Sequence, residues 1–143
     1  MMLVTTSRKP GQLTRAVARA LAKAFGAEYL NRGKAGMDSV LGHAETLGIS
    51  HVLFVWEKNG NPARLVAFDG DWIEPEIQVQ GVVFPRKSFR GQGGKITVED
   101  DAGQVFKELF KPEPGPNKIL LSGSKLSLFN SGELLLELRF KEE

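Results

Sequence analysis

The stretch LVTTSRKPGQLTRAVARALAKAFGAEYL, residues 3–30, predicts a strand, an amphipathic helix and a second strand in succession. The β-prone residues 3–6 stop at a basic, turn-forming segment, residues 7–11. Apolar side chains then recur at helical spacing until Gly26, which suits a helix end: Leu13, Ala16, Val17, Ala20, Leu21, Ala24 and Phe25. A strand, a helix and a strand in this order form a parallel β-α-β unit.

The residues that follow extend this unit into an α/β lobe. A second amphipathic helix is predicted over residues 37–47. The nearly continuous apolar run 51–56 is typical of a strand that is covered on both faces. Asn59-Gly60 is a strong hairpin signal and leads into a further strand at residues 64–68. This order of elements places helices on a mixed sheet.

The second half of the chain is richer in strand signals. Alternating or apolar segments predict strands at residues 77–82, 119–121, 125–129 and 134–138. A short helix is expected around residues 105–110, and the proline-rich residues 112–117 are expected to form a loop. Asn130-Ser131-Gly132 is expected to be a three-residue hairpin loop.

Length and composition fit one globular domain. With 143 residues, 41% of them hydrophobic and 25% charged, the chain can bury a single core. The predicted fold class is α/β (α+β), with helices packed on mixed sheets. The domain spans residues 1–143, and its two halves, about 1–72 and 73–143, meet at the turn-rich residues 70–75.

The compartment follows from two further features. The chain has no cysteine, and no apolar run approaches the roughly 20 residues that cross a bilayer. We therefore expect a cytoplasmic protein without a membrane partner, and a monomer.

Positive charge is concentrated at the N-terminal end of the chain. The net charge of the whole sequence is only +2, but residues 1–34 hold seven basic side chains against Glu28, a net charge of +6. The remaining residues hold 12 basic and 16 acidic side chains, a net charge of −4. Such an asymmetry indicates that one end of the molecule faces a polyanion, although a simply solvated surface is the alternative.

Within this end, the first helix has a basic face. Arg15, Arg19 and Lys23 lie at i, i+4 and i+8, opposite the apolar positions, with no carboxylate between them. Arg8 and Lys9 precede the helix N-terminus, where the helix dipole and free N–H groups favour a phosphate. Two more cations, Arg32 and Lys34, follow the second strand. Because loops after neighbouring parallel strands lie at one sheet edge, we expect the two pairs to converge there.

A second basic cluster lies in the glycine-rich middle of the chain. The cluster consists of Arg86, Lys87, Arg90 and Lys95 and contains Phe89, a combination that suits phosphate contacts together with base stacking. A surface loop whose aromatic side chain packs into the core is the alternative interpretation.

Signals for catalysis are weak. The two histidines, His43 and His51, have no nucleophile or acid at a recognisable spacing. The segment Gly91-Gln92-Gly93-Gly94-Lys95 lacks the Ser or Thr that a phosphate-binding loop needs after its lysine. Two acidic groups are expected to be solvated turns and not metal sites: Glu99-Asp100-Asp101, and Asp69 with Asp71 and Glu74. We therefore predict no catalytic site, no metal and no cofactor.

The motifs Thr5-Thr6-Ser7-Arg8-Lys9-Pro10 and Asn31-Arg32-Gly33-Lys34, one on each side of the first helix, resemble the Brix-domain family of ribosome-biogenesis proteins, in particular its short archaeal members. The order of elements fits along nearly the whole chain. The matched positions are Thr6, Ser7, Arg8, Pro10, Arg15, Arg32, Gly33 and Lys34. At Gly11 the chain departs from the serine that is more frequent in the family.

The resemblance implies two α/β halves akin to the anticodon-binding domains of class II aminoacyl-tRNA synthetases. It also implies a non-catalytic role in pre-rRNA processing and ribosomal subunit assembly, with rRNA or pre-rRNA and ribosomal or assembly proteins as partners. The candidate RNA-binding residues are Ser7, Arg8, Lys9, Arg15, Arg19, Lys23, Arg32, Lys34, Arg86, Lys87 and Arg90. A protein-interaction scaffold without RNA contact, or an enzyme acting on a small molecule, are the alternatives.

Overall fold

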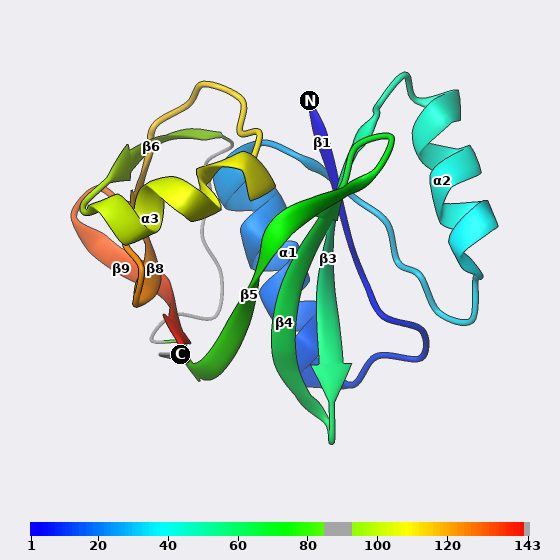
Figure 1. Ribbon diagram of the computed structural model, residues 1–143, viewed down its shortest axis with the longest axis horizontal. Coiled ribbons are helices and arrows are strands. Elements are labelled where there is room, and N and C mark those ends of the chain that lie inside the picture. Colours follow the sequence, from blue (N-terminus) through cyan, green and yellow to red (C-terminus); the bar gives the residue numbers. More distant parts are fainter. Residues whose placement is uncertain (85–92, 142–143) are drawn as a thin grey trace.

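One mixed β-sheet runs through the whole molecule (Figure 1). The computed structural model describes residues 1–84 and 93–141. Within them the strands lie in the order β2-β1-β3-β4-β5-β9-β8-β7-β6. The strands are β1 (Met2–Thr6), β2 (Glu28–Tyr29), β3 (His51–Lys58), β4 (Asn61–Phe68), β5 (Trp72–Val83), β6 (Gly94–Val98), β7 (Asn117–Leu121), β8 (Lys125–Asn130) and β9 (Glu133–Phe140). The helices are α1 (Gln12–Phe25), α2 (Met37–Thr46), α3 (Asp101–Phe106) and the short 3-10 helix η1 (Lys107–Leu109).

The helix predicted from apolar spacing is confirmed as α1. Gly26 ends it in the left-handed conformation, at φ +66°, and the N–H of Ala27 then donates to the carbonyl of Ala22 at 2.8 Å. This is the pairing expected where a glycine terminates a helix. Leu13 is the exception in the predicted apolar face, because 38% of its surface is exposed.

The helices of the first half lie on opposite faces of the sheet. Side chains alternate along β3, so that Leu53 and Val55 face the core around α1, whereas Val52 and Phe54 face α2. Figure 1 shows α2 beside β1 and β3, while the same face of β4 and β5 has no helix over it. The outer face of these strands is therefore only partly covered.

The two halves share one pattern of strand pairing. In the first half β1 pairs in parallel with β3, and β3, β4 and β5 follow as antiparallel neighbours. In the second half β6 pairs in parallel with β7, and β7, β8 and β9 follow as antiparallel neighbours. This confirms the expected fold class. The division at residue 72 and the likeness to anticodon-binding domains stay predictions.

β5 belongs to both halves of the sheet. Its first residues pair with β4, as in Trp72 with Phe68, and its last residues pair with β9, as in Val83 with Glu137. Each half thus uses the same strand to close its own part of the sheet.

The end of α1 also joins the two halves. Its last carbonyl groups accept hydrogen bonds from the second half: Lys23 from the N–H of Gly93 (3.2 Å), Ala24 from Nδ2 of Asn117 (3.3 Å) and Phe25 from the N–H of Glu113 (2.8 Å). Gly93 adopts φ +86°, and a Cβ atom there would lie 2.6 Å from the carbonyl oxygens of Glu113 and Pro114. Only glycine fits this contact.

Two local predictions are corrected. β6 lies partly within the stretch that the sequence presented as a glycine-rich basic loop, and it was not predicted. The hairpin between β8 and β9 has a two-residue loop and not three, because Asn130 pairs directly with Glu133. Ser131 and Gly132 have φ +51° and +82°, as a type I′ turn requires.

Candidate nucleic-acid interface

The loops that follow β1 and β2 lie side by side. The N–H of Lys9 donates to the carbonyl of Gly33 at 2.7 Å, and Nε of Arg8 donates to the carbonyl of Lys34 at 3.2 Å. The two strands are parallel neighbours, so both loops leave the same edge of the sheet. The prediction that the two basic loops converge is confirmed.

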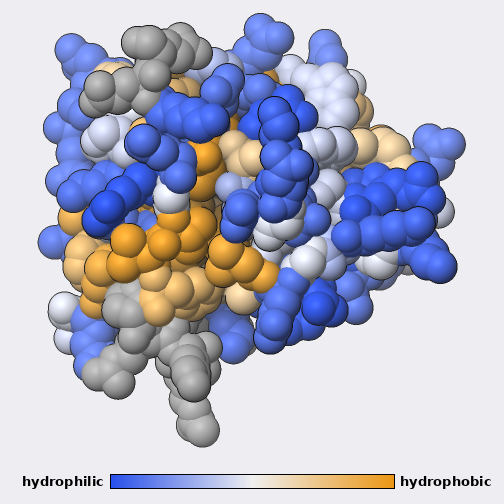
Figure 2. All heavy atoms as spheres, turned by 90° about the horizontal axis from the view of Figure 1, so that it is seen from below, coloured by the Kyte–Doolittle hydropathy of each residue, from blue (hydrophilic) through white to orange (hydrophobic). Residues whose placement is uncertain are grey.

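Three cations at this edge are open to solvent. Arg8, Lys9 and Lys34 are exposed, and none of them forms an ion pair with a carboxylate within residues 1–84 and 93–141. Figure 2 looks onto the end of the molecule at which α1 begins. Its surface is mostly hydrophilic, with one hydrophobic area beside the residues drawn in grey. The loops thus present uncompensated positive charge to solvent.

The basic face of α1 continues this surface. The guanidinium of Arg19 lies 5.6 Å from the ring centre of Tyr29, which places the face on the β2 side of the helix. Lys23 is exposed, and Arg15 is half-buried with an Nε that has no hydrogen-bond partner in the described structure. A buried donor without a partner is costly to the fold. We call Arg8, Lys9, Lys34, Arg15, Arg19 and Lys23 the basic edge.

Ser7 has partners within the fold. It is buried, its N–H donates to the carbonyl of Val55 at 3.1 Å, and its Oγ accepts from the N–H of Glu57 at 3.0 Å. The side chain therefore joins the end of β1 to the end of β3, and the role of Ser7 as an RNA contact stays a prediction.

Arg32 is also buried, with only 5% of its surface exposed. Its guanidinium donates to the carbonyls of Thr6 (3.0 Å) and Ala35 (2.9 Å), and it lies within 6 Å of the rings of Phe54 and Trp56, at 5.8 and 5.9 Å. Burial lowers the pKa of Arg32 below its ordinary value, and the positive charge of Arg8 lowers it further. The expectation of an exposed Arg32 is wrong, because this guanidinium fastens the two loops to the sheet.

The N-terminus of α1 already holds an anion. Oε1 of Glu57, from β3, accepts from the N–H of Gly11 at 2.7 Å and from Oγ1 of Thr14 at 2.8 Å. The sequence predicted a phosphate at this helix end. A carboxylate of the chain itself takes this position and offsets the positive end of the helix dipole.

Most of the second basic cluster lies outside the described residues, namely Arg86, Lys87 and Arg90. Its fourth member, Lys95, is exposed and belongs to β6.

The remaining candidates have structural partners. Nε2 of His51 lies 2.8 Å from the carbonyl oxygen of Leu109, inside the protein. Oδ1 of Asp100 accepts from the N–H groups of Gly103 and Gly123, so it caps α3. In the described parts of the chain, no group of three potential metal ligands occurs, and no helix has the length and apolar character that crossing a membrane requires.

Fold and surface together define a basic α/β domain whose two halves share a strand. A relative from Archaeoglobus fulgidus, a probable Brix domain-containing ribosomal biogenesis protein, is 42% identical over an alignment 159 positions long, which covers 97% of this chain and 94% of the relative. The chain belongs to the Brix-domain family of ribosomal biogenesis proteins.

Two further comparisons agree with this assignment. A Methanothermobacter thermautotrophicus relative of the same description is 44% identical over 68 residues, which are 48% of this chain and only 41% of that protein. The crystal structure of an archaeal Imp4-like protein superposes with a TM-score of 0.76 at 26% identity, covering 99% of this chain and 97% of that one. No family model matches the chain.

Proposed function

We propose that this protein is a ribosome biogenesis factor that binds rRNA or pre-rRNA during processing and subunit assembly, and that it chaperones the RNA without catalysing a reaction. The observation on which the proposal rests is the basic edge, where loop and helix cations gather without carboxylate partners among the described residues. Like charges held together gain nothing in the free protein, but they gain from a polyanion.

The shape of the basic edge suits a nucleic-acid backbone. Arg15, Arg19 and Lys23 span roughly 12 Å along the axis of α1, because a helix rises about 1.5 Å per residue. Arg8, Lys9 and Lys34 extend the surface from the first turn of the helix onto the sheet edge. Such a surface contacts phosphates and carries no code for base sequence. We therefore expect affinity for RNA in general, with site selection supplied by RNA structure or by other assembly components in the cytoplasm.

Salt dependence tests this proposal. If roughly four to seven cations contact single-stranded RNA, the logarithm of affinity falls with the logarithm of salt concentration at a slope of about −3 to −5. Titration of labelled rRNA fragments between low and physiological salt measures the slope. A flat dependence, or no binding at low salt, would contradict the proposal and favour a protein scaffold without RNA contact.

Absence of turnover is the second part of the proposal. Purified protein incubated with nucleoside triphosphates or rRNA is expected to leave both intact. Hydrolysis that persists after repurification and disappears on changing one named residue would refute it.

A further inference from the structure

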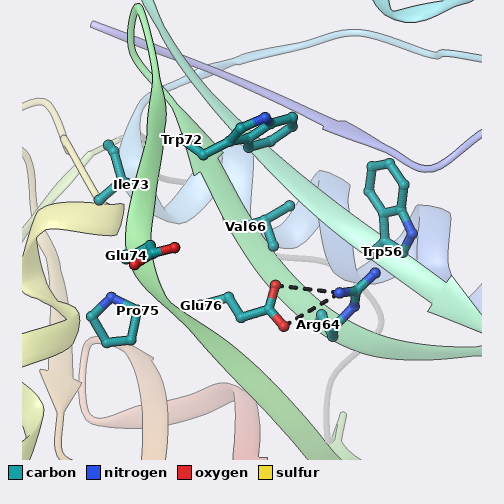
Figure 3. A pocket seen from close by; sticks show the side chains of 8 residues that line it. All are labelled: Trp56, Arg64, Val66, Trp72, Ile73, Glu74, Pro75 and Glu76. Carbon is teal, nitrogen blue, oxygen red and sulfur yellow. Dashed lines mark hydrogen bonds and ion pairs between the residues drawn. The ribbon is translucent and has the colours of Figure 1, made fainter.

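A hollow of about 640 Å³ lies on the outer face of β3, β4 and β5 (Figure 3). Trp56, Val66 and Trp72 form its apolar part, and Arg64, Glu74 and Glu76 form its polar part. The Brix-family function proposed above does not use this groove. We call it the tryptophan groove.

The shape of the groove comes from an irregularity in the sheet. The pairing of β4 with β5 shifts register between Leu65 and Ala67, so that residues 74–76 bulge opposite Val66. Pro75, within the bulge, has no N–H to donate to the ladder. A bulge bends its strand and redirects side chains, which here turns the carboxylates of Glu74 and Glu76 toward the hollow (Figure 3).

The aromatic part is exposed but fixed in place. Trp72 is 48% exposed, yet its ring contacts Phe54 and Phe68 at centroid distances of 5.9 and 5.2 Å. The guanidinium groups of Arg64 and Arg32 each lie 5.9 Å from the ring centre of Trp56. The groove therefore contains one indole with cation–π partners, Trp56, and one exposed indole, Trp72.

The charge of this face is opposite to that of the basic edge. Residues 65–76 contain four carboxylates, Asp69, Asp71, Glu74 and Glu76, and no lysine or arginine. Glu76 pairs with Arg64 at 3.3 Å. Glu74 is exposed and has no hydrogen bond or ion pair within the described residues. A free carboxylate beside an exposed indole favours a cation and repels phosphate.

We propose that the tryptophan groove binds an extended, arginine-bearing segment of a partner protein. A guanidinium would lie over the indole of Trp72 and donate to the carboxylate of Glu74. Arginine fits better than lysine because its planar group stacks on an aromatic ring and pairs with a carboxylate at the same time. The protein would then bind two partners: RNA at the basic edge, and a basic protein segment in the tryptophan groove.

Intrinsic fluorescence tests this binding directly, because both tryptophans of the chain line the groove. The full-length protein is titrated with an acetylated pentapeptide of alternating glycine and arginine. The matching glycine–glutamate peptide and a uridine oligonucleotide serve as comparison ligands. We expect a saturable fluorescence change with the arginine peptide alone.

Substitutions then locate the site. Glu74→Gln and Trp72→Ala should each weaken the arginine peptide at least about threefold, as expected for the loss of one exposed cation–π contact or ion pair. Glu108→Gln, which removes an exposed carboxylate on η1, should change nothing. None of the three should alter rRNA affinity, so failure here is separable from failure of the proposed RNA function.

Three results would overturn the proposal. The peptide affinity could be the same in Glu74→Gln as in the unaltered protein. The glutamate peptide could bind as well as the arginine peptide. Trp72→Ala could weaken the uridine oligonucleotide instead, which would make the groove a base-stacking surface.

Discussion

The carboxylate of Glu57 accepts a hydrogen bond from the hydroxyl of Thr14 at 2.8 Å, and so fixes the end of β3 to the first turn of α1. The same oxygen accepts from the N–H of Gly11 at 2.7 Å. Both donors belong to the N-terminus of α1, which a phosphate would otherwise find free. Glu57 therefore caps the helix, and under the proposed function it would compete there with an RNA phosphate.

Replacement of Glu57 by alanine should change stability and RNA affinity in opposite directions. Loss of the cap should lower the free energy of unfolding by roughly 1 kcal/mol. Removal of a negative charge from the N-terminus of α1 should tighten RNA binding at low salt. Chemical denaturation and RNA titration measure the two effects, and weaker RNA binding in a folded variant would contradict the assignment.

Replacement of Arg32 and of Arg8 by alanine should affect stability differently, although the two positive charges lie close enough to influence each other. Arg32→Ala removes buried hydrogen bonds to the carbonyls of Thr6 and Ala35, and we expect it to cost about 2–4 kcal/mol of unfolding free energy. Arg8→Ala affects an exposed side chain and should stay within about 0.5 kcal/mol. Thermal melts of the two variants decide this. Equal stability would mean that the contacts of Arg32 are not needed for the fold.

The basic edge should bind RNA as a defined site. Changing Arg8, Arg19 and Lys23 together to glutamate should weaken rRNA binding at least about tenfold at low salt, roughly 1.4 kcal/mol, and make the salt slope shallower. The melting temperature should hardly change, because all three side chains are exposed. The charge-matched control changes Lys107, Lys118 and Lys141, exposed residues of the second half. Equal losses from both sets would show that only net charge matters.

Gly93 should be intolerant of any side chain. Gly93→Ala places a Cβ atom 2.6 Å from two carbonyl oxygens at a positive φ, where other residues are strained. We expect it to destabilise the protein by more than about 2 kcal/mol. Gly33→Ala is the matched control, since Gly33 also has a positive φ but no atom within 4 Å of its Cβ position. If both variants lose a similar free energy of unfolding, the positive φ alone explains the loss and the close contacts of Gly93 do not contribute.

Local sequence patterns were sufficient for most of the fold. The spacing of Val17, Leu21 and Phe25 predicts α1, and Asn59-Gly60 predicts the hairpin between β3 and β4. Each of these signals is contained in a short segment of the chain. β6 was missed because its glycine start lies at the end of a glycine-rich stretch. Its strand character depends on pairing with β7, more than 20 residues later.

The candidate site was predictable in position but not in detail. Parallel strand order alone brings the loops of Arg8 and Lys34 together. The burial of Ser7 and Arg32 was not predictable, since it depends on partners such as Glu57 that are distant in sequence. The tryptophan groove depends likewise on a bulge that brings Glu74 beside Trp72, and no local pattern signals it.

The position of β5 has a consequence during synthesis of the chain. Its last residues, 79–83, remain an open edge until β9, whose Phe140 is the partner of Val79, has been made. An open edge of this kind is a template for pairing with another chain. A fragment that ends at residue 84 is therefore expected to self-associate, and β9 acts as protection against aggregation as well as a part of the core.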